Sequence, residues 1–105
     1  MYIVIFITAS NKEEAGKIGN KLVENKLAAC VNIIDNVCSV FWWEAKLDSA
    51  NEVFMLVKSK KSHLSRIIKL VKSLHSYQVP EIIALPIIGG DKKYLKWIDE
   101  SCSLK

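Results

Sequence analysis

Two prolines near the C-terminal end of this 105-residue chain constrain its fold more than any other feature. Pro80 precedes a nearly continuous apolar run from Glu81 to Ile87, and Pro86 lies near the end of that run. Proline has no amide proton to donate, and it pushes the preceding residue toward extended backbone. The run is therefore predicted to be a short strand, with Pro80 at its start and Pro86 at its far or edge end.

A glycine pair at residues 89–90 breaks the chain after this strand. Asp91 follows directly, and an aspartate in that place accepts hydrogen bonds from the free amides of a helix's first turn. A last helix is predicted to start there. Tyr94, Leu95 and Ile98 are expected to fall on one face of this helix.

Length and composition predict one small domain over residues 1–105, because half of the residues are hydrophobic and the chain is long enough for a single core. The apolar runs are shorter than the ~20 residues that a membrane span needs, and the first residues lack the basic flank of a signal peptide. Three cysteines without a C-x-x-C pair fit free thiols in a reducing compartment. We therefore expect a cytoplasmic protein with no membrane partner.

The net charge of +4 owes much to a basic cluster between residues 58 and 72. Such a cluster can bind nucleic acid. On a helix, however, the basic residues would lie mostly opposite the apolar ones and form its solvated face. We expect no nucleic-acid partner.

The first half of the chain begins with an apolar strand over residues 2–9. Ser10 and Glu13 have the spacing of a capping box, which predicts a helix that runs to about Asn25. The buried stripe of this helix is expected to contain Ala15, Ile18, Leu22 and Val23.

Residues 27–43 are rich in β-branched and aromatic side chains, and predict one long strand bent at Asp35-Asn36. The polar stretch 47–51 is predicted to form the tip of a hairpin. Residues 52–60 would then return as the partner strand.

Ser59 is predicted to cap a second helix that ends near His75. The element order is then βαββαβ with an extra C-terminal helix. That order predicts an α+β fold, the ferredoxin-like plait, with two helices on one face of an antiparallel sheet and a long hairpin between the second and third strands.

Three motifs of the chain resemble the CutA family, small cytoplasmic proteins linked to divalent-cation tolerance. They are LAACVNII at residues 27–34, VFWWEAKLDSANEV at 40–53 and YQVPEIIALPIIGGDKKYLKW at 77–97. The resemblance extends over nearly the whole chain, and implies a role in tolerance of or response to divalent cations such as copper.

The resemblance also implies a homotrimer whose hairpins extend the sheets of neighbouring subunits. The sequence supports self-association, because a strand with apolar residues on both faces predicts burial on both sides. The residues expected at the trimer interface are Phe41, Trp42 and Trp43.

Where copper binding is described for CutA proteins, the suggested ligands are a cysteine before the Thr-Ala that ends the first strand and a histidine pair before the Tyr of the last motif. This chain has Ile7 and the pair Leu74-His75 at those places, so only His75 carries over as a metal candidate. A single imidazole is a weak ligand. The alternative for His75 is a structural role, with the ring capping a free helix carbonyl. Cys30 is expected to be a small core residue and Cys102 to be exposed.

No nucleophile elbow or phosphate-binding glycine loop marks an active site, so we expect a protein that is not an enzyme. A second hypothesis is a trimeric signalling or scaffold module of the PII type, which binds a small effector or a partner protein in clefts between subunits. His75, Tyr77 and Glu81 are the residues expected to line such a cleft.

Overall fold

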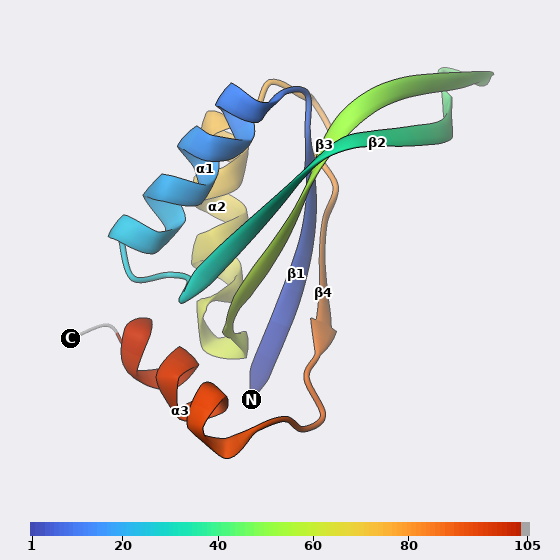
Figure 1. Ribbon diagram of the computed structural model, residues 1–105. Coiled ribbons are helices and arrows are strands. Elements are labelled where there is room, and N and C mark those ends of the chain that lie inside the picture. Colours follow the sequence, from blue (N-terminus) through green and yellow to red (C-terminus); the bar gives the residue numbers. More distant parts are fainter. Residues whose placement is uncertain (104–105) are drawn as a thin grey trace.

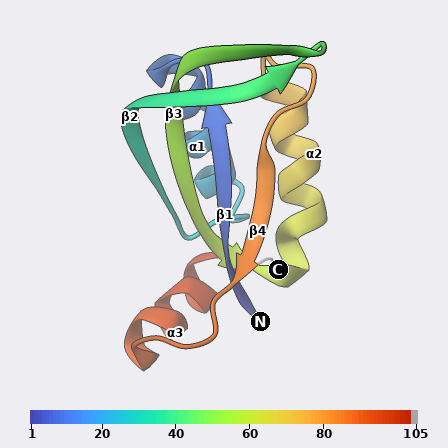
Figure 2. The ribbon, with the colours of Figure 1, turned by 90° about the vertical axis from the view of Figure 1, so that its right-hand side faces the viewer.

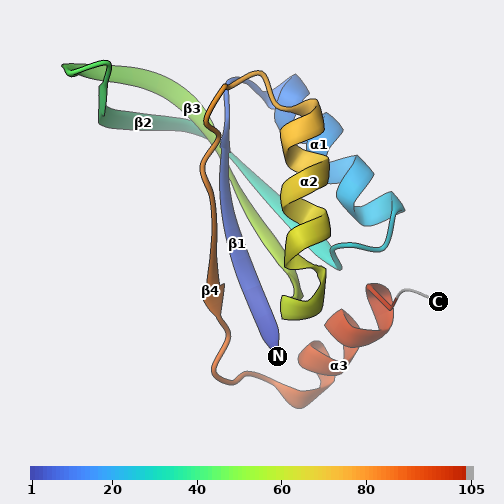
Figure 3. The same cartoon turned by 180° about the vertical axis from the view of Figure 1, so that it is seen from behind.

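The computed structural model describes residues 1–103. Its elements form a four-stranded antiparallel sheet in the order β2-β3-β1-β4, with α1 and α2 together on one face (Figures 1 and 3). The predicted α+β plait is confirmed. In chain order the elements are β1 (Tyr2–Ala9), α1 (Lys12–Glu24), β2 (Cys30–Trp43), β3 (Lys46–Lys60), a short 3-10 helix (Lys61–His63), α2 (Leu64–Leu74), β4 (Ile82–Pro86) and α3 (Lys92–Ser101).

The core lies between the sheet and the two helices, because alternate residues of β1 and β3 point toward α1 and α2. Strand residues that are fully buried there are Ile5, Ile7, Met55 and Val57. Their helical partners, also fully buried, are Ala15, Ile18, Leu22, Ile67 and Val71. Val23, which was predicted to be buried, is 43% exposed, because it lies on the outer side of α1.

The start of α1 lies one residue later than predicted. Asn11 caps it by accepting a hydrogen bond from the Glu14 amide at 2.8 Å, and the Glu14 carboxylate reaches back to the Ser10 amide at 3.1 Å. The predicted box of Ser10 and Glu13 is therefore wrong. The physical reason is that asparagine caps a helix as well as serine does. In addition, the Glu14 carboxylate is held in place by the amide of Ser76 as well as that of Ser10.

Two glycines of α1 differ in what surrounds them. A Cβ added to Gly16 would meet nothing within 4 Å, whereas one added to Gly19 would lie 3.3 Å from Cγ1 of Val31 on β2. We expect Gly16→Ala to raise the free energy of unfolding by about 0.5–1 kcal/mol. In Gly19→Ala the contact with Val31 should cancel that gain. Denaturant titration at one fixed protein concentration measures both, and equal stabilisation would contradict the close approach of α1 to β2.

The long hairpin turns at Glu44 and Ala45, whose φ angles of 50° and 62° are those of a tight two-residue turn. The predicted tip at residues 47–51 is wrong, because those residues are paired with β2 inside β3. The predicted bend at residues 35–36 is confirmed as a shift of register between Ile34 and Val37. Beyond it the hairpin projects from the sheet as an arm, residues 37–52 (Figure 1).

Ser59 does not cap α2, so that prediction is also wrong. It lies in β3, fully buried, and its hydroxyl donates to the Leu27 carbonyl. The last helix starts as predicted, since the Asp91 carboxylate accepts from the Tyr94 amide at 3.0 Å. β4 lies at the edge of the sheet, and Pro86 is its last residue, at the far end where it was predicted.

The end of α3 packs back under the sheet, near the start of β1 (Figure 3). Nε2 of His63 lies 2.5 Å from the Cys102 carbonyl oxygen, and Nζ of Lys60 lies 3.1 Å from a carboxylate oxygen of Asp99. Cys102 is fully buried in a small second cluster with Ala29 and Ile98. The predicted exposure of this cysteine is therefore wrong.

Within residues 1–103, no helix covers the sheet face opposite α1 and α2 (Figure 2). We call it the open face. Paired residues of β1, β3 and β4 make it apolar, and Ile83 is 52% exposed. The open face contains Val4, Phe6, Phe54, Leu56, Ile83 and Leu85. Within residues 1–103, no helix is long and apolar enough to cross a membrane.

Candidate functional site

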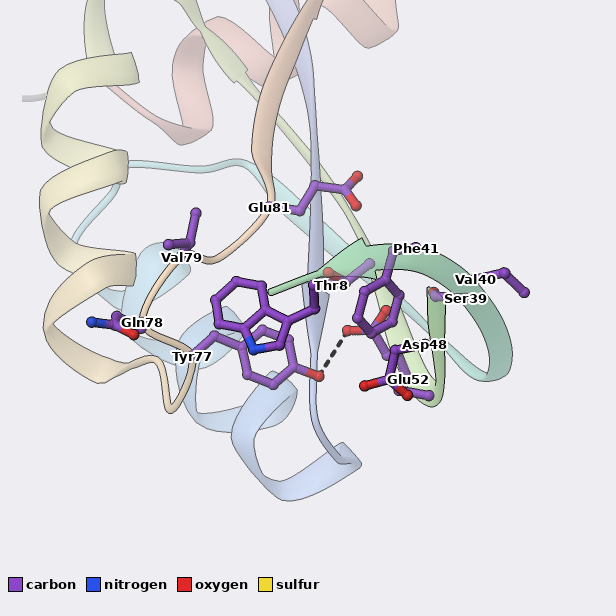
Figure 4. Close-up of a pocket in the computed structure, with 12 residues that line it drawn as sticks. Thr8, Ser39, Val40, Phe41, Asp48, Glu52, Tyr77, Gln78, Val79 and Glu81 are labelled. Carbon is purple, nitrogen blue, oxygen red and sulfur yellow. Dashed lines mark hydrogen bonds between the residues drawn. The ribbon is translucent and has the colours of Figure 1, made fainter. Parts of the chain in front are cut away.

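A cavity of about 690 Å³, which we call the pocket, lies between the arm and the segment at 77–81 that leads into β4 (Figure 4). The bend after Ile34 orients the arm so that one face of the arm lies opposite the segment at 77–81. The pocket is lined by Thr8, Ser39, Val40, Phe41, Trp43, Asp48, Ala50, Glu52, Tyr77, Gln78, Val79 and Glu81. The pocket therefore joins segments of three strands and one loop.

The Tyr77 hydroxyl donates a hydrogen bond of 2.7 Å to Oε2 of Glu52, across the pocket wall (Figure 4). Glu52 is only 8% exposed. Burial, followed by the hydrogen bond to Glu52, raises the pKa of Tyr77 well above its ordinary value, so the phenol stays protonated and keeps donating. At the rim, partial burial followed by the charge of Glu52 raises the pKa of Glu81.

His75 fixes the segment that carries Tyr77. Its Nε2 lies 2.7 Å from the Thr8 carbonyl and therefore donates, while its Nδ1 accepts from the Tyr77 amide at 3.0 Å. The side chain is fully buried, and its ring lies 4.7 Å from the Tyr77 ring between centroids. His75 also ends α2, but the carbonyl that its ring caps belongs to β1 and not to the helix.

Glu14 supports the same segment from the start of α1. Its two carboxylate oxygens accept from the amides of Ser10 and Ser76, both at 3.1 Å, and one lies 3.6 Å from Nδ1 of His75. Burial by itself would raise the pKa of Glu14, but the hydrogen bonds from Ser76 and Ser10 and the nearby His75 lower it below its ordinary value. Glu14 and His75 together form a clamp that places Tyr77 against Glu52.

The donors that a metal would need are scattered. Within residues 1–103, no group of three or more His, Cys, Asp or Glu side chains is arranged to hold a metal ion. Cys30 is half-buried and Cys38 is exposed, and both lie on β2, while Cys102 lies at the end of α3. Both ring nitrogens of His75 already have hydrogen-bond partners.

Three residues are predicted for a cleft. Tyr77 and Glu81 line the pocket, whereas His75 lies behind its wall. Phe41 and Trp43 line it as well. Trp42 lies on the opposite face of the arm and is 73% exposed, because side chains alternate along a strand.

Glu52 and Asp48 were missed from the sequence. The sequence pattern that could have found them is alternation along a strand. Asp48, Ala50 and Glu52 are every second residue, so their side chains share one face of the arm. That signal was hidden because residues 47–51 were interpreted as a turn.

A family model described as the CutA1 divalent ion tolerance protein matches residues 3–101. The divalent-cation tolerance protein CutA of Archaeoglobus fulgidus is 46% identical over 101 residues, 96% of this chain and 98% of that protein. The chloroplastic protein CutA 1 of rice is 43% identical over 99 residues, 94% of this chain. The chain spans only about half, 56%, of the length of that plant relative.

Solved structures of related proteins have the same fold. The periplasmic divalent cation tolerance protein CutA of Archaeoglobus fulgidus gives a TM-score of 0.95 at 46% identity, covering 98% of this chain and 100% of its own. The divalent cation tolerance protein of Thermus thermophilus gives 0.96 at 40% identity, with 98% and 100% covered. This chain therefore belongs to the CutA1 divalent ion tolerance family.

Proposed function

We propose that this chain is a homotrimeric, non-enzymatic module of the divalent-cation response that acts by binding a small ligand in the pocket. The observation that carries the proposal is the Tyr77–Glu52 pair in a cavity of about 690 Å³, a volume typical of small-molecule sites. A clamp of buried hydrogen bonds holds Tyr77 in position. This interpretation favours the PII-like hypothesis over direct metal chelation.

The trimer is part of the proposal because the single chain leaves two apolar surfaces uncovered. One is the open face, with Ile83 52% exposed, and the other is the arm, with Trp42 73% and Leu47 66% exposed. Contiguous apolar surface of this kind marks association sites in folded proteins. In a trimer the arm of each chain would reach its neighbour, so the pocket would lie between subunits, once per chain. Single-domain organisation over residues 1–105 and a cytoplasmic location stay predictions.

A divalent cation remains the proposed partner of His75, and we expect that binding to be weak. The imidazole is fully buried, and its Nδ1 would have to release the Tyr77 amide before it could coordinate a metal. One imidazole without thiolate or second-histidine support gives little affinity. Copper, zinc and nickel are the ions to compare.

The test is isothermal titration of Cu²⁺, Zn²⁺ and Ni²⁺ into reduced wild-type protein and into His75→Gln. Glutamine has one group to donate to the Thr8 carbonyl and one to accept from the Tyr77 amide, so the variant removes the imidazole but keeps a donor and an acceptor at this position. We expect no stoichiometric micromolar binding in either protein, with the oligomer checked by light scattering. Stoichiometric micromolar copper binding that disappears in His75→Gln would overturn the proposal and make the protein a metal binder.

A further inference from the structure

The pocket is acidic in a chain that is basic overall. Among the residues that the structure describes, its lining contains the carboxylates of Asp48, Glu52 and Glu81 and no lysine, arginine or histidine. The chain as a whole has a net charge of +4. The charge of the pocket is therefore opposite to that of the surrounding molecule, and favours a positively charged occupant.

The part of the chain that the structure describes leaves the negative charge of the pocket without a cation. Among residues 1–103, none of the three carboxylates has a basic side chain within ion-pair distance. Glu52 is only 8% exposed, and its hydrogen-bond partner is the neutral hydroxyl of Tyr77. A buried carboxylate without a cation is costly, and at Glu81 partial burial, followed by the charge of Glu52, raises the pKa.

Aromatic rings form the other part of the lining. Phe41 and Trp43 come from the face of β2 that looks into the pocket, and Tyr77 comes from the segment opposite. A cation close to such rings is attracted by their negative faces. The combination of carboxylates and rings suits an alkylated ammonium group, which has both charge and apolar surface.

A metal ion fits the same pocket poorly. Divalent magnesium or calcium needs about six or more oxygens at 2.0–2.6 Å, and rings supply none. No metal-holding group of three side chains occurs within the part of the chain that the structure describes. The volume of about 690 Å³ is also far larger than an ion requires and lies in the range of organic ligands.

We propose that the pocket binds a small organic cation, an alkylated or quaternary ammonium compound, with Glu52 and Glu81 facing its charge and Phe41, Trp43 and Tyr77 enclosing its alkyl groups. This inference rests on the proposed function, in which the pocket is a ligand site. It adds the chemical class of the ligand. Each chain of the trimer would hold one cation.

The experiment is a calorimetric titration of the intact trimer with choline at low ionic strength, alongside 3,3-dimethyl-1-butanol, its uncharged counterpart of nearly the same shape. We expect choline to bind once per chain and the alcohol to bind at least about tenfold more weakly. Glu52→Gln keeps an acceptor for the Tyr77 hydroxyl but removes the charge, and should weaken choline binding at least about tenfold. Glu100→Gln, an equal loss of charge on exposed α3, should leave it unchanged.

The inference is overturned if the alcohol binds as tightly as choline, or if Glu52→Gln and Glu100→Gln weaken choline equally. Loss of the cation preference can be distinguished from loss of the whole ligand site by measuring the melting temperature with a panel of neutral and anionic small molecules. A compound of that panel whose shift is lost in the pocket-filling variant Ala50→Phe would keep the pocket as a ligand site and overturn its preference for cations. Absence of any shift, with choline or with the panel, would overturn both.

Discussion

Ile83→Asp is expected to be a folded monomer. The Ile83 side chain is 52% exposed on the open face, so an aspartate there stays solvated in a single chain and leaves the helix-covered core intact. In the proposed trimer the open face is covered. Each aspartate would then be buried without a partner, at a cost of roughly 3 kcal/mol or more per chain. Because every chain of the trimer pays this cost, assembly should fail at micromolar concentration.

Light scattering distinguishes the two states, since wild-type protein should have three times the chain mass of 11.9 kDa and the variant only that mass. Circular dichroism checks that the variant is folded. Val23→Asp is the matched control, because Val23 is 43% exposed on the outer side of α1, away from the open face. A trimeric Ile83→Asp protein, or a Val23→Asp variant that dissociates equally, would contradict assembly through the open face.

The elements that bury a core could be predicted from the sequence. β1 and α1 have residues with the right period, and both lie within a residue or two of the predicted bounds. The cap at Asp91 and the bend at 35–36 were also found, because an aspartate before a helix and a turn-forming pair in a long strand act locally. Local chemistry was sufficient in these places.

The arm could not be predicted in the same way, because it has no core of its own in the single chain. Residues 47–51 are polar since they lie far from α1 and α2, and that polarity was interpreted as a turn. The true turn at Glu44 and Ala45 lacks the Asn-Gly signal usual for two residues of positive φ. Polar residues in a sequence can therefore indicate a strand that lies far from a core as well as a turn.

The site was predictable in part for a similar reason. Tyr77 and Glu81 belong to one motif, and both line the pocket. Glu52 is 25 residues away from its partner Tyr77 in the sequence, so no local spacing connects them. Only the fold, which bends the arm over the 77–81 segment, brings the pair together.

Glu14→Ala is expected to lower the free energy of unfolding by about 2–4 kcal/mol, because it leaves the amides of Ser10 and Ser76 without their charged acceptor. The loss should also release the segment that carries Tyr77, which the Glu14 carboxylate holds together with His75. Denaturant titration at neutral pH and fixed protein concentration measures the stability. Glu13→Ala is the matched control, since Glu13 is the exposed neighbour in the same helical turn and has the same favourable place near the helix N-terminus.

The pH dependence separates the clamp from a general effect on α1. The folded-state pKa of Glu14 is lowered below its ordinary value of 4.5, so its contribution is fully present above that value and is lost as the pH falls through the lower, folded-state pKa. The stability difference between wild type and Glu14→Ala should therefore be constant near neutral pH and shrink in acid below pH 4.5. Glu13→Ala, measured over the same pH range, is the reference for changes that affect α1 as a whole. If both variants lose equal stability at neutral pH, the carboxylate of Glu14 does not hold the Tyr77 segment, and the pocket wall must depend on His75 alone.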